Sequence, residues 1–250
     1  MFLAEHDGPI LRLTLDRPEV RNALNDTLIA DLTCVFRDLP KEIRAVVLAG
    51  EGKSFCAGGD LEWMRRAANY TEEENYQDAL KLGGLFTAIA RCPALVVARV
   101  QGAAFGGGAG LVACCDVAIA EENTQFAFSE VRLGLVAATI SVYVVPKIGS
   151  GNARWLFATG EAFDSQTALR IGLIHEVTNI VDLDAAIQRK LDVVLRAGPA
   201  AVAASKKICL DGPYSMEDSA RLLASARSGS EAREGIAAFL EKRPASFVVT

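Results

Sequence analysis

The sequence contains few of the residues that build metal sites or disulfide frameworks. Histidine occurs only twice, at His6 and His175, and neither has a second histidine or a cysteine at the spacing typical of a metal-ligand pair. The six cysteines include no CxxC pair, so buried, reduced thiols are their simplest interpretation. Reduced thiols are typical of the cytoplasm, and we therefore expect a cytoplasmic protein. Because neither histidine has a partner at ligand spacing, we expect no metal site.

Positive charge and long apolar runs are also scarce. Lysine and arginine number 26 against 31 aspartates and glutamates, and the net charge is −5. A chain without a basic stripe is a poor candidate for binding nucleic acid or a membrane surface, and we expect neither partner. The longest apolar run, 109–120, contains Asp116 and is about half as long as a membrane span. Glu5 and Asp7 stand where a signal peptide would carry basic residues, so no signal peptide is expected.

Apolar residues, by contrast, make up 51% of the 250 residues, enough for one large domain or for a core with a small appendage. Short apolar strands at 45–49 and 95–100 alternate with helical patterns such as the amphipathic stretch 80–92. This alternation predicts an α/β fold with crossover connections. From residue 182 onward the pattern is mostly helical, which predicts a separate layer. The high apolar content favours burial of some surface between subunits.

Two glycine-rich segments could expose backbone N–H groups to a ligand. The segment 54–61, SFCAGGDL, follows a strand, and its small side chains let a ligand approach the backbone. The segment 102–108, GAAFGGG, opens an apolar helix, whose first N–H groups are unpaired and carry partial positive charge. Neither a dinucleotide fingerprint nor a P-loop is present. An oxyanion site and the tight packing of an ordinary turn or helix are both open interpretations.

Glu130 is the acidic side chain whose surroundings best suit proton transfer. It lies in the segment 126–135, FAFSEVRLGL, among aromatic and aliphatic residues, where loss of hydration would raise its pKa. The alternative is a salt bridge between Glu130 and Arg132 or another cation at a strand edge. This segment alone does not decide between the two.

The ordered set SFCAGGDL, VQGAAFGGG and FSEVRLGL resembles the crotonase superfamily, also called the enoyl-CoA hydratase/isomerase family. The resemblance runs from RPEVRNALN near the start of the sequence to EGIAAFLEKRPASF near its end. It implies an α/β, crotonase-like spiral of ββα units over residues 1–190, which carries the active site. It also implies a helical region over residues 191–250 that packs trimers, or hexamers of paired trimers, and supplies part of the coenzyme A site.

The resemblance further implies an acyl-CoA substrate. Coenzyme A enters as part of that substrate, and no separate cofactor is expected. The thioester oxygen is expected between the backbone N–H groups of Ala57 and Gly107, where fixed donors stabilise an enolate, while Glu130 moves the proton. The other expected substrate contacts are Arg21, Ala23, Gly58, Gly59, Asp60, Leu61 and Gly110 and, from a neighbouring subunit, Phe239 and Lys242.

One departure from the family pattern concerns Gly110. Family hydratases often hold a water between two glutamates, and Gly110 stands at the position of the first one. A carboxylate from Asp60, Glu62 or Glu122 is a candidate for the vacated place. Without a replacement, Glu130 alone can activate a water and return its proton, or shuttle a proton between two carbons.

The leading hypothesis is therefore a 2-enoyl-CoA hydratase. The segment 136–143, VAATISVY, together with GGGAGLVACCD and SEVRLGL, looks most like bacterial hydratases of methylglutaconyl-type branched substrates. Ser141 or Tyr143 is a candidate for placing water or a substrate carboxylate. The alternatives are a Δ3–Δ2 enoyl-CoA isomerase that uses Glu130 as its sole base, an inactive acyl-CoA-binding protein, and an RNA-binding relative. The acidic balance of the chain argues against the last of these.

Overall fold

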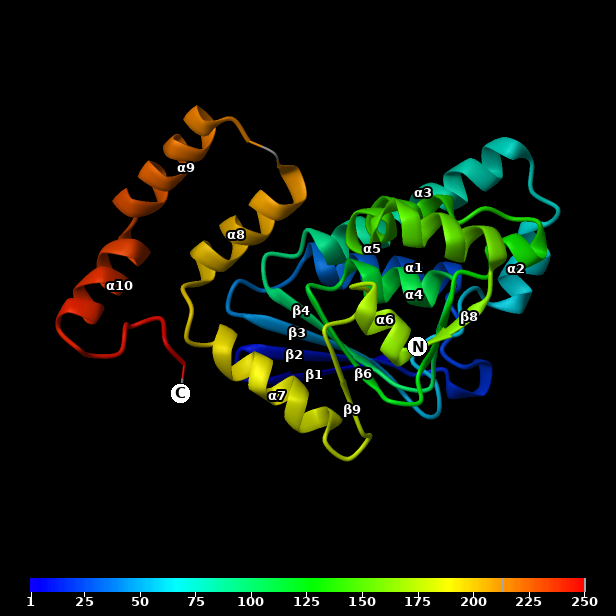
Figure 1. Cartoon of the computed structure of the whole chain (residues 1–250), viewed down its shortest axis with the longest axis horizontal. Coiled ribbons are helices and arrows are strands. Elements are labelled where there is room, and N and C mark those ends of the chain that lie inside the picture. Colours follow the sequence, from blue (N-terminus) through cyan, green and yellow to red (C-terminus); the bar gives the residue numbers. More distant parts are fainter. Residues whose placement is uncertain (213, 250) are drawn as a thin grey trace.

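The computed structural model describes residues 1–212 and 214–249. Figure 1 shows a body built of strands and covering helices, from which the C-terminal helices extend to one side. The body confirms the predicted α/β class, with parallel strands joined by helical crossovers. None of the helices in the described residues combines the length and the apolar character needed to cross a bilayer.

A six-stranded sheet forms the centre of the body. Its strands occur in the order β1 (Phe2–Asp7), β2 (Ile10–Leu15), β3 (Ala45–Gly50), β4 (Leu95–Val100), β6 (Val117–Glu121) and β9 (Glu176–Thr178). Neighbouring strands are parallel except β1 and β2, which are antiparallel. Strands β3 and β4 confirm the two predicted apolar strands. Burial of β3 along its whole length explains its continuous apolar sequence.

A second, smaller sheet brings the two glycine-rich segments together. It consists of β5 (Ala103–Phe105), β7 (Gln125–Ala127) and β8 (Ala162–Asp164), with β7 in the middle. An isolated bridge between Cys56 and Ala104 connects the loop after β3 to β5. The segments 54–61 and 102–108 are therefore neighbours in space.

Helices cover both faces of the large sheet. One face packs against α1 (Asp26–Arg37), α3 (Glu72–Ala90), α4 (Gly107–Cys114) and α5 (Ala138–Thr159), and the other against α7 (Leu183–Val194). Helix α4 is buried on all sides beyond its first residue, which explains why its sequence is apolar without an amphipathic period. The shorter helices are η1 (Pro18–Val20), α2 (Leu61–Ala67), η2 (Glu130–Leu133) and α6 (Ser165–Arg170).

Helix α3 begins earlier than the amphipathic stretch 80–92 predicts. Thr71 is its N-cap, and the Thr71 hydroxyl accepts a hydrogen bond from the N–H of Glu74 (3.2 Å). The Glu74 carboxylate accepts in return from the N–H of Thr71 (2.7 Å). This reciprocal capping fixes the start of the helix in a stretch too polar to show an apolar stripe.

The predicted helical C-terminal region consists of α8 (Pro199–Asp211), α9 (Met216–Ser228) and α10 (Ser230–Leu240). Helices α8 and α9 bury no residue in the single chain, and Figure 1 shows α9 and α10 standing away from the sheet. An ion pair between Lys206 and Asp116 (2.6 Å) ties α8 to the body. The division at residue 190, which lies inside α7, and the role of this region in a trimer remain predictions.

Candidate active site

Glu130 supplies a buried carboxylate oxygen beside the turn that precedes α4. It is the first residue of η2, which follows β7. A Cβ atom at Gly106 would lie 3.4 Å from the Oε1 of Glu130. The Oε2 atom is buried and has no hydrogen-bond partner among the described residues. Burial raises the pKa of the Glu130 carboxyl above its ordinary value, which suits it to take up and return a proton.

The alternative in which Glu130 forms a salt bridge with Arg132 is wrong. The Arg132 side chain packs near Gly160 at the end of α5, where its Nε would lie 3.5 Å from a Cβ at that glycine. Asp60 and Asp116, two other carboxylates of the body, are both in ion pairs. The unpaired oxygen therefore distinguishes Glu130 from these structural carboxylates.

The N–H of Gly107 is free at the start of α4. Gly106, with a φ of 49°, turns the chain into the helix, and Gly107 is the first helical residue. Its N–H has no acceptor among the described residues, as is usual in the first turn of a helix. A Cβ at Gly107 would lie 3.0 Å from the Cδ1 of Leu24, and one at Gly108 would overlap the carbonyl of Cys56. The glycines thus allow close packing and also leave an amide uncovered.

The structure corrects the predicted role of Ala57. Its N–H donates to the carbonyl oxygen of Arg21 (3.0 Å), so it is satisfied within the protein and is not free for a thioester oxygen. The loop after β3 runs beside the segment 21–24 and binds it with alternate backbone groups. The motif identifies the loop, but nothing in it shows which N–H faces the neighbouring segment.

Gly59 carries a free and partly exposed amide in this loop. Gly59 and Leu24 form an isolated parallel bridge, in which the Leu24 N–H donates to the carbonyl of Gly58 (2.7 Å) and its carbonyl accepts from the N–H of Asp60 (2.8 Å). The bridge uses the groups on either side of Gly59, so the Gly59 N–H points away from the Leu24 backbone. It has no acceptor among the described residues. Since the Leu24 side chain abuts Gly107, both free amides belong to residues that contact Leu24.

Apolar side chains close the position of the family's first glutamate. A Cβ at Gly110 would lie 2.5 Å from the Cγ2 of Ile140 and 3.0 Å from the Cζ of Phe86. Both side chains are buried, with exposed fractions of 2% and 0%. Gly110 is therefore required for the packing of α4 against α3 and α5, and any side chain there would displace its neighbours.

The hypothesis of a replacement carboxylate is wrong for all three candidates. The Asp60 carboxylate caps α2, accepts from the N–H groups of Glu62 (2.8 Å) and Trp63 (3.2 Å), and pairs with Arg17 (2.7 Å). Burial alone would favour the neutral acid, but the Arg17 guanidinium and the capping amides hold the pKa of Asp60 below its ordinary value. The side chains of Glu62 and Glu122 are exposed.

The predicted coenzyme A contacts from the first half of the chain lie together. The segment 21–24 pairs with 57–60, which places Arg21 and Leu61 on the surface beside the Gly59 amide. Arg21 adopts a left-handed conformation with a φ of 54°, and Leu61 is 75% exposed. Ala23 and Gly58 are buried, so only their backbone groups could approach a ligand. The Asp60 carboxylate is engaged within the protein.

Phe239 and Lys242 do not reach this site within one chain. They lie in and just after α10, which Figure 1 shows at the opposite end of the molecule from α2. The Phe239 side chain is 81% exposed, as a contact residue for another subunit would be in a single chain. Their contribution from a neighbouring subunit stays a prediction.

Ser141 and Tyr143 are both hydrogen bonded inside the protein. The Ser141 hydroxyl donates to the carbonyl of Ala138 (2.7 Å), and the Tyr143 hydroxyl pairs with that of Thr87 (2.9 Å). Neither contact supports a role in placing water.

The site residues that the sequence did not reveal are Leu24, Phe86 and Ile140, together with Gly59 as the donor. The only sequence signal for the three apolar residues was their place in helical or turn patterns.

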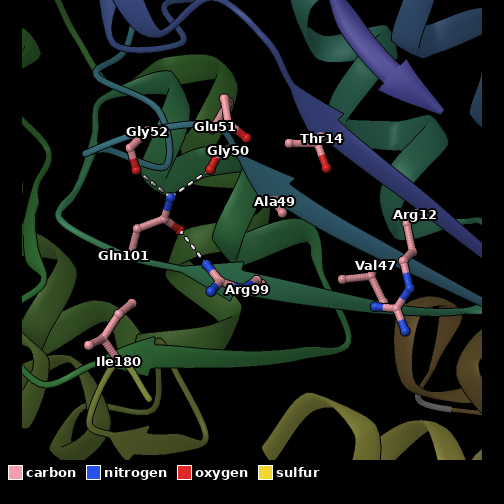
Figure 2. A pocket seen from close by; sticks show the side chains of 10 residues that line it. All are labelled: Arg12, Thr14, Val47, Ala49, Gly50, Glu51, Gly52, Arg99, Gln101 and Ile180. Carbon is pink, nitrogen blue, oxygen red and sulfur yellow. Dashed lines mark hydrogen bonds between the residues drawn. The ribbon is translucent and has the colours of Figure 1, made fainter. Parts of the chain in front are cut away.

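A separate groove lies along the C-terminal halves of β2, β3 and β4. It has a volume of about 380 Å³, and Figure 2 shows Arg12, Thr14, Arg99 and Gln101 among the residues that line it. The Arg99 guanidinium is already paired with Asp184 (2.6 Å). Glu130, Gly59 and Gly107 do not line the groove, so it is not the candidate active site.

Known proteins share both the sequence pattern and this arrangement of strands and helices. The family described as enoyl-CoA hydratase/isomerase matches residues 5–249. The chain is 32% identical to the crotonyl-CoA hydratase of Syntrophomonas wolfei, over 99% of this chain and 97% of that protein. An enoyl-CoA hydratase from Shewanella pealeana is 36% identical with a TM-score of 0.94, over 98% of this chain and 95% of the other. AtuE from Pseudomonas aeruginosa is 36% identical with a TM-score of 0.95, over 99% of each chain. The chain therefore belongs to the enoyl-CoA hydratase/isomerase family of enzymes, the crotonase superfamily.

Proposed function

We propose that the protein is an enoyl-CoA hydratase that adds water across the double bond of a 2-enoyl-CoA with Glu130 as its single acid–base group. The observation that carries this proposal is the buried, unpaired Oε2 of Glu130, next to the glycine turn that opens α4. Relatives that match over nearly their full length, such as the crotonyl-CoA hydratase of Syntrophomonas wolfei, favour hydration over isomerisation.

In the proposed mechanism, the thioester oxygen lies between the N–H groups of Gly59 and Gly107. Glu130 takes a proton from water as the water oxygen bonds to C3, and the electrons of the double bond move toward the thioester oxygen to form an enolate. The two amides stabilise this charge, and loss of one such donor costs about 3 kcal/mol in other enzymes. Glu130 then returns the proton to C2, so the product gains one water and the carboxylate is regenerated.

One carboxylate is sufficient because its two tasks follow one another. Ile140 and Phe86 fill the place of the other family glutamate, so water is activated from the Glu130 side alone. The buried Oε2 favours proton uptake by Glu130, since loss of hydration destabilises its charged form. The same arrangement also supports an isomerase, which needs only one carboxylate to move a proton between carbons.

Product analysis in ¹⁸O-labelled water separates these activities. A hydratase acting on crotonyl-CoA removes the conjugated enoyl absorbance and gives a product heavier by one labelled water. An isomerase converts a 3-enoyl-CoA into the conjugated isomer with no change in mass. A chain that binds these thioesters and transforms neither would overturn both assignments and support an inactive acyl-CoA-binding protein.

A branched, methylglutaconyl-type substrate is a finer proposal within the hydratase class. It rests on the resemblance of the segment 136–143, together with GGGAGLVACCD and SEVRLGL, to that subgroup. The ratio of kcat/KM for 3-methylglutaconyl-CoA to that for crotonyl-CoA tests it, and a ratio below one would reject it.

Completion of the coenzyme A site by Phe239 and Lys242 of a neighbouring subunit is likewise proposed, since a lysine suits a phosphate of coenzyme A.

A further inference from the structure

We propose that Asn22 and Gln101 are positioning residues, two buried side-chain amides that fix the distance between the free N–H groups of Gly59 and Gly107. The proposal rests on the proposed function, in which these two N–H groups together hold the thioester oxygen. Neither Asn22 nor Gln101 needs to touch the substrate, because each acts through the backbone that carries one of the donors.

Gln101 connects the loop after β3 to the chain that leads into α4. Its exposed fraction is only 7%, and its Nε2 donates to the carbonyl oxygens of Gly50 (2.6 Å) and Gly52 (3.2 Å), as Figure 2 shows. The next residue, Gly102, lies so close to the loop that a Cβ atom there would overlap the carbonyl of Lys53. A displacement of the loop would therefore also move the start of β5 and, beyond it, Gly107.

Asn22 binds the same loop from the segment that pairs with Gly59. Its exposed fraction is 0%, and its left-handed φ of 57° is one that asparagine tolerates better than most residues. Its Nδ2 donates to the carbonyl oxygens of Glu51 (2.9 Å) and Ser54 (2.8 Å). Two residues later, Leu24 forms the bridge to Gly59. Asn22 thus holds the beginning of the loop, at residues 51–54, beside the segment that pairs with Gly59 at the end of the loop.

Together the two side chains bind the carbonyl oxygens of residues 50, 51, 52 and 54. Removal of the Gln101 or the Asn22 amide would take this donor from the buried carbonyl of Gly50 or of Ser54, respectively, which favours a different loop conformation. The chain runs from this loop directly to Gly59, and it runs from Gln101 through β5 to Gly107. A misplacement of about 1 Å at a reacting group is enough to lower a rate about 100-fold. The geometry therefore assigns the spacing of the two donors to Asn22 and Gln101.

The variants Asn22→Asp and Gln101→Glu keep the size of each side chain and remove its NH₂ donor. The probe is butyryl-CoA with a ¹³C label at the thioester carbonyl, a saturated ligand whose C=O stretching frequency reports hydrogen bonding to the oxygen. We expect kcat for crotonyl-CoA to fall by about 10- to 100-fold and KM to change less. The C=O frequency of the bound probe should move toward its value in free solution.

Asn25→Ala is the matched control. Asn25 is three residues from Asn22, but its side chain caps α1 by accepting from the N–H of Leu28 (2.9 Å), outside the loop. Its loss should lower Tm and leave kcat and the C=O frequency unchanged. If Asn22→Asp does not fold, Gln101→Asn, which keeps the amide but shortens its reach, is measured in the same way.

Two outcomes separate failure of the inference from failure of the proposed function. If the loop variants lower Tm as the control does, but kcat and the C=O frequency stay at the values of the unmodified protein, Asn22 and Gln101 have only a structural role. If the probe shows no frequency shift on binding to the unmodified protein, the pair of amides does not hold the thioester oxygen, and the proposed mechanism itself is wrong.

Discussion

The two positions that carry carboxylates in family hydratases differ here in both chemistry and packing. At position 130 a carboxylate is present, and one of its oxygens is buried without a partner. At position 110 a glycine is present, and Ile140 and Phe86 occupy the space that a side chain would need. The second carboxylate is therefore not merely missing, because its place has become part of the apolar core. The comparison indicates a site organised around one proton-transfer group. Substitutions at position 130 and at position 110 both test it.

The largest expected effect comes from Glu130→Gln, which keeps the shape of the side chain and removes its basicity. If Glu130 is the only acid–base group, kcat should fall by at least about 100-fold, the lower end of the usual contribution of such a group. Glu122→Gln, the same substitution at an exposed position, is the control and should leave kcat unchanged. Steady-state hydration of crotonyl-CoA measures both variants. Near-normal activity of Glu130→Gln would show that another group moves the proton.

A smaller effect is expected from the reverse experiment, Gly110→Glu. Family hydratases often have glutamate at this position, but here the new side chain would collide with Ile140 and Phe86. We expect the free energy of unfolding to fall by about 1–3 kcal/mol, as is typical of overpacking, without a gain in kcat. Chemical denaturation and crotonyl-CoA hydration measure the two quantities.

Gly83→Glu provides the matched control for that substitution. Gly83 is also a helical glycine, in α3, but a Cβ atom there would meet nothing within 4 Å. The free energy of unfolding should change little or rise, because glutamate favours helix more than glycine does. A Gly110→Glu variant that is as stable as Gly83→Glu and more active than the parent would contradict the closed second position.

Strands could be predicted from the sequence where burial leaves a continuous apolar pattern. Exposed strands and very short strands leave no such pattern and could not be predicted. Strands β3 and β4 were predicted because they are largely or wholly buried. Strand β1, FLAEHD, was missed because it is an exposed edge strand in which three apolar residues precede three polar ones without alternation. Strands β5, β7 and β8 have three residues each, too few for an alternating pattern to show. Their pairing depends on contacts between distant segments.

For the candidate site, local signals made Glu130 and the glycine turn before α4 candidates, the family resemblance then selected Glu130 and Gly107, and neither identified the loop donor. A glutamate in an apolar segment and a glycine at a helix start stand out among neighbouring residues, but their roles were inferred from the order of the three motifs. The choice between Ala57 and Gly59 depends on pairing with residues 21–24, which no local pattern encodes. The closure of position 110 depends on Ile140, contributed by another helix. Tertiary contacts of this kind explain both errors.

The smallest expected effect is a pH-dependent gain of stability in Glu130→Gln. Burial raises the pKa of Glu130 in the folded protein, so the folded state binds this proton more readily than the unfolded state does. The free energy of unfolding of the parent should therefore decrease, relative to the variant, as the pH rises from the ordinary glutamate value of about 4.3 through the raised folded value. Above that window we expect Glu130→Gln to be more stable by about 1 kcal/mol, the lower end of the penalty for an unpaired buried polar group. Urea denaturation at pH 4 and pH 8 measures the difference, with Glu122→Gln as the exposed control. A variant that is equally stable at pH 8 would show that the folded protein bears no penalty for the charged Glu130, and position 130 would then lose the property that separates it from an ordinary surface carboxylate.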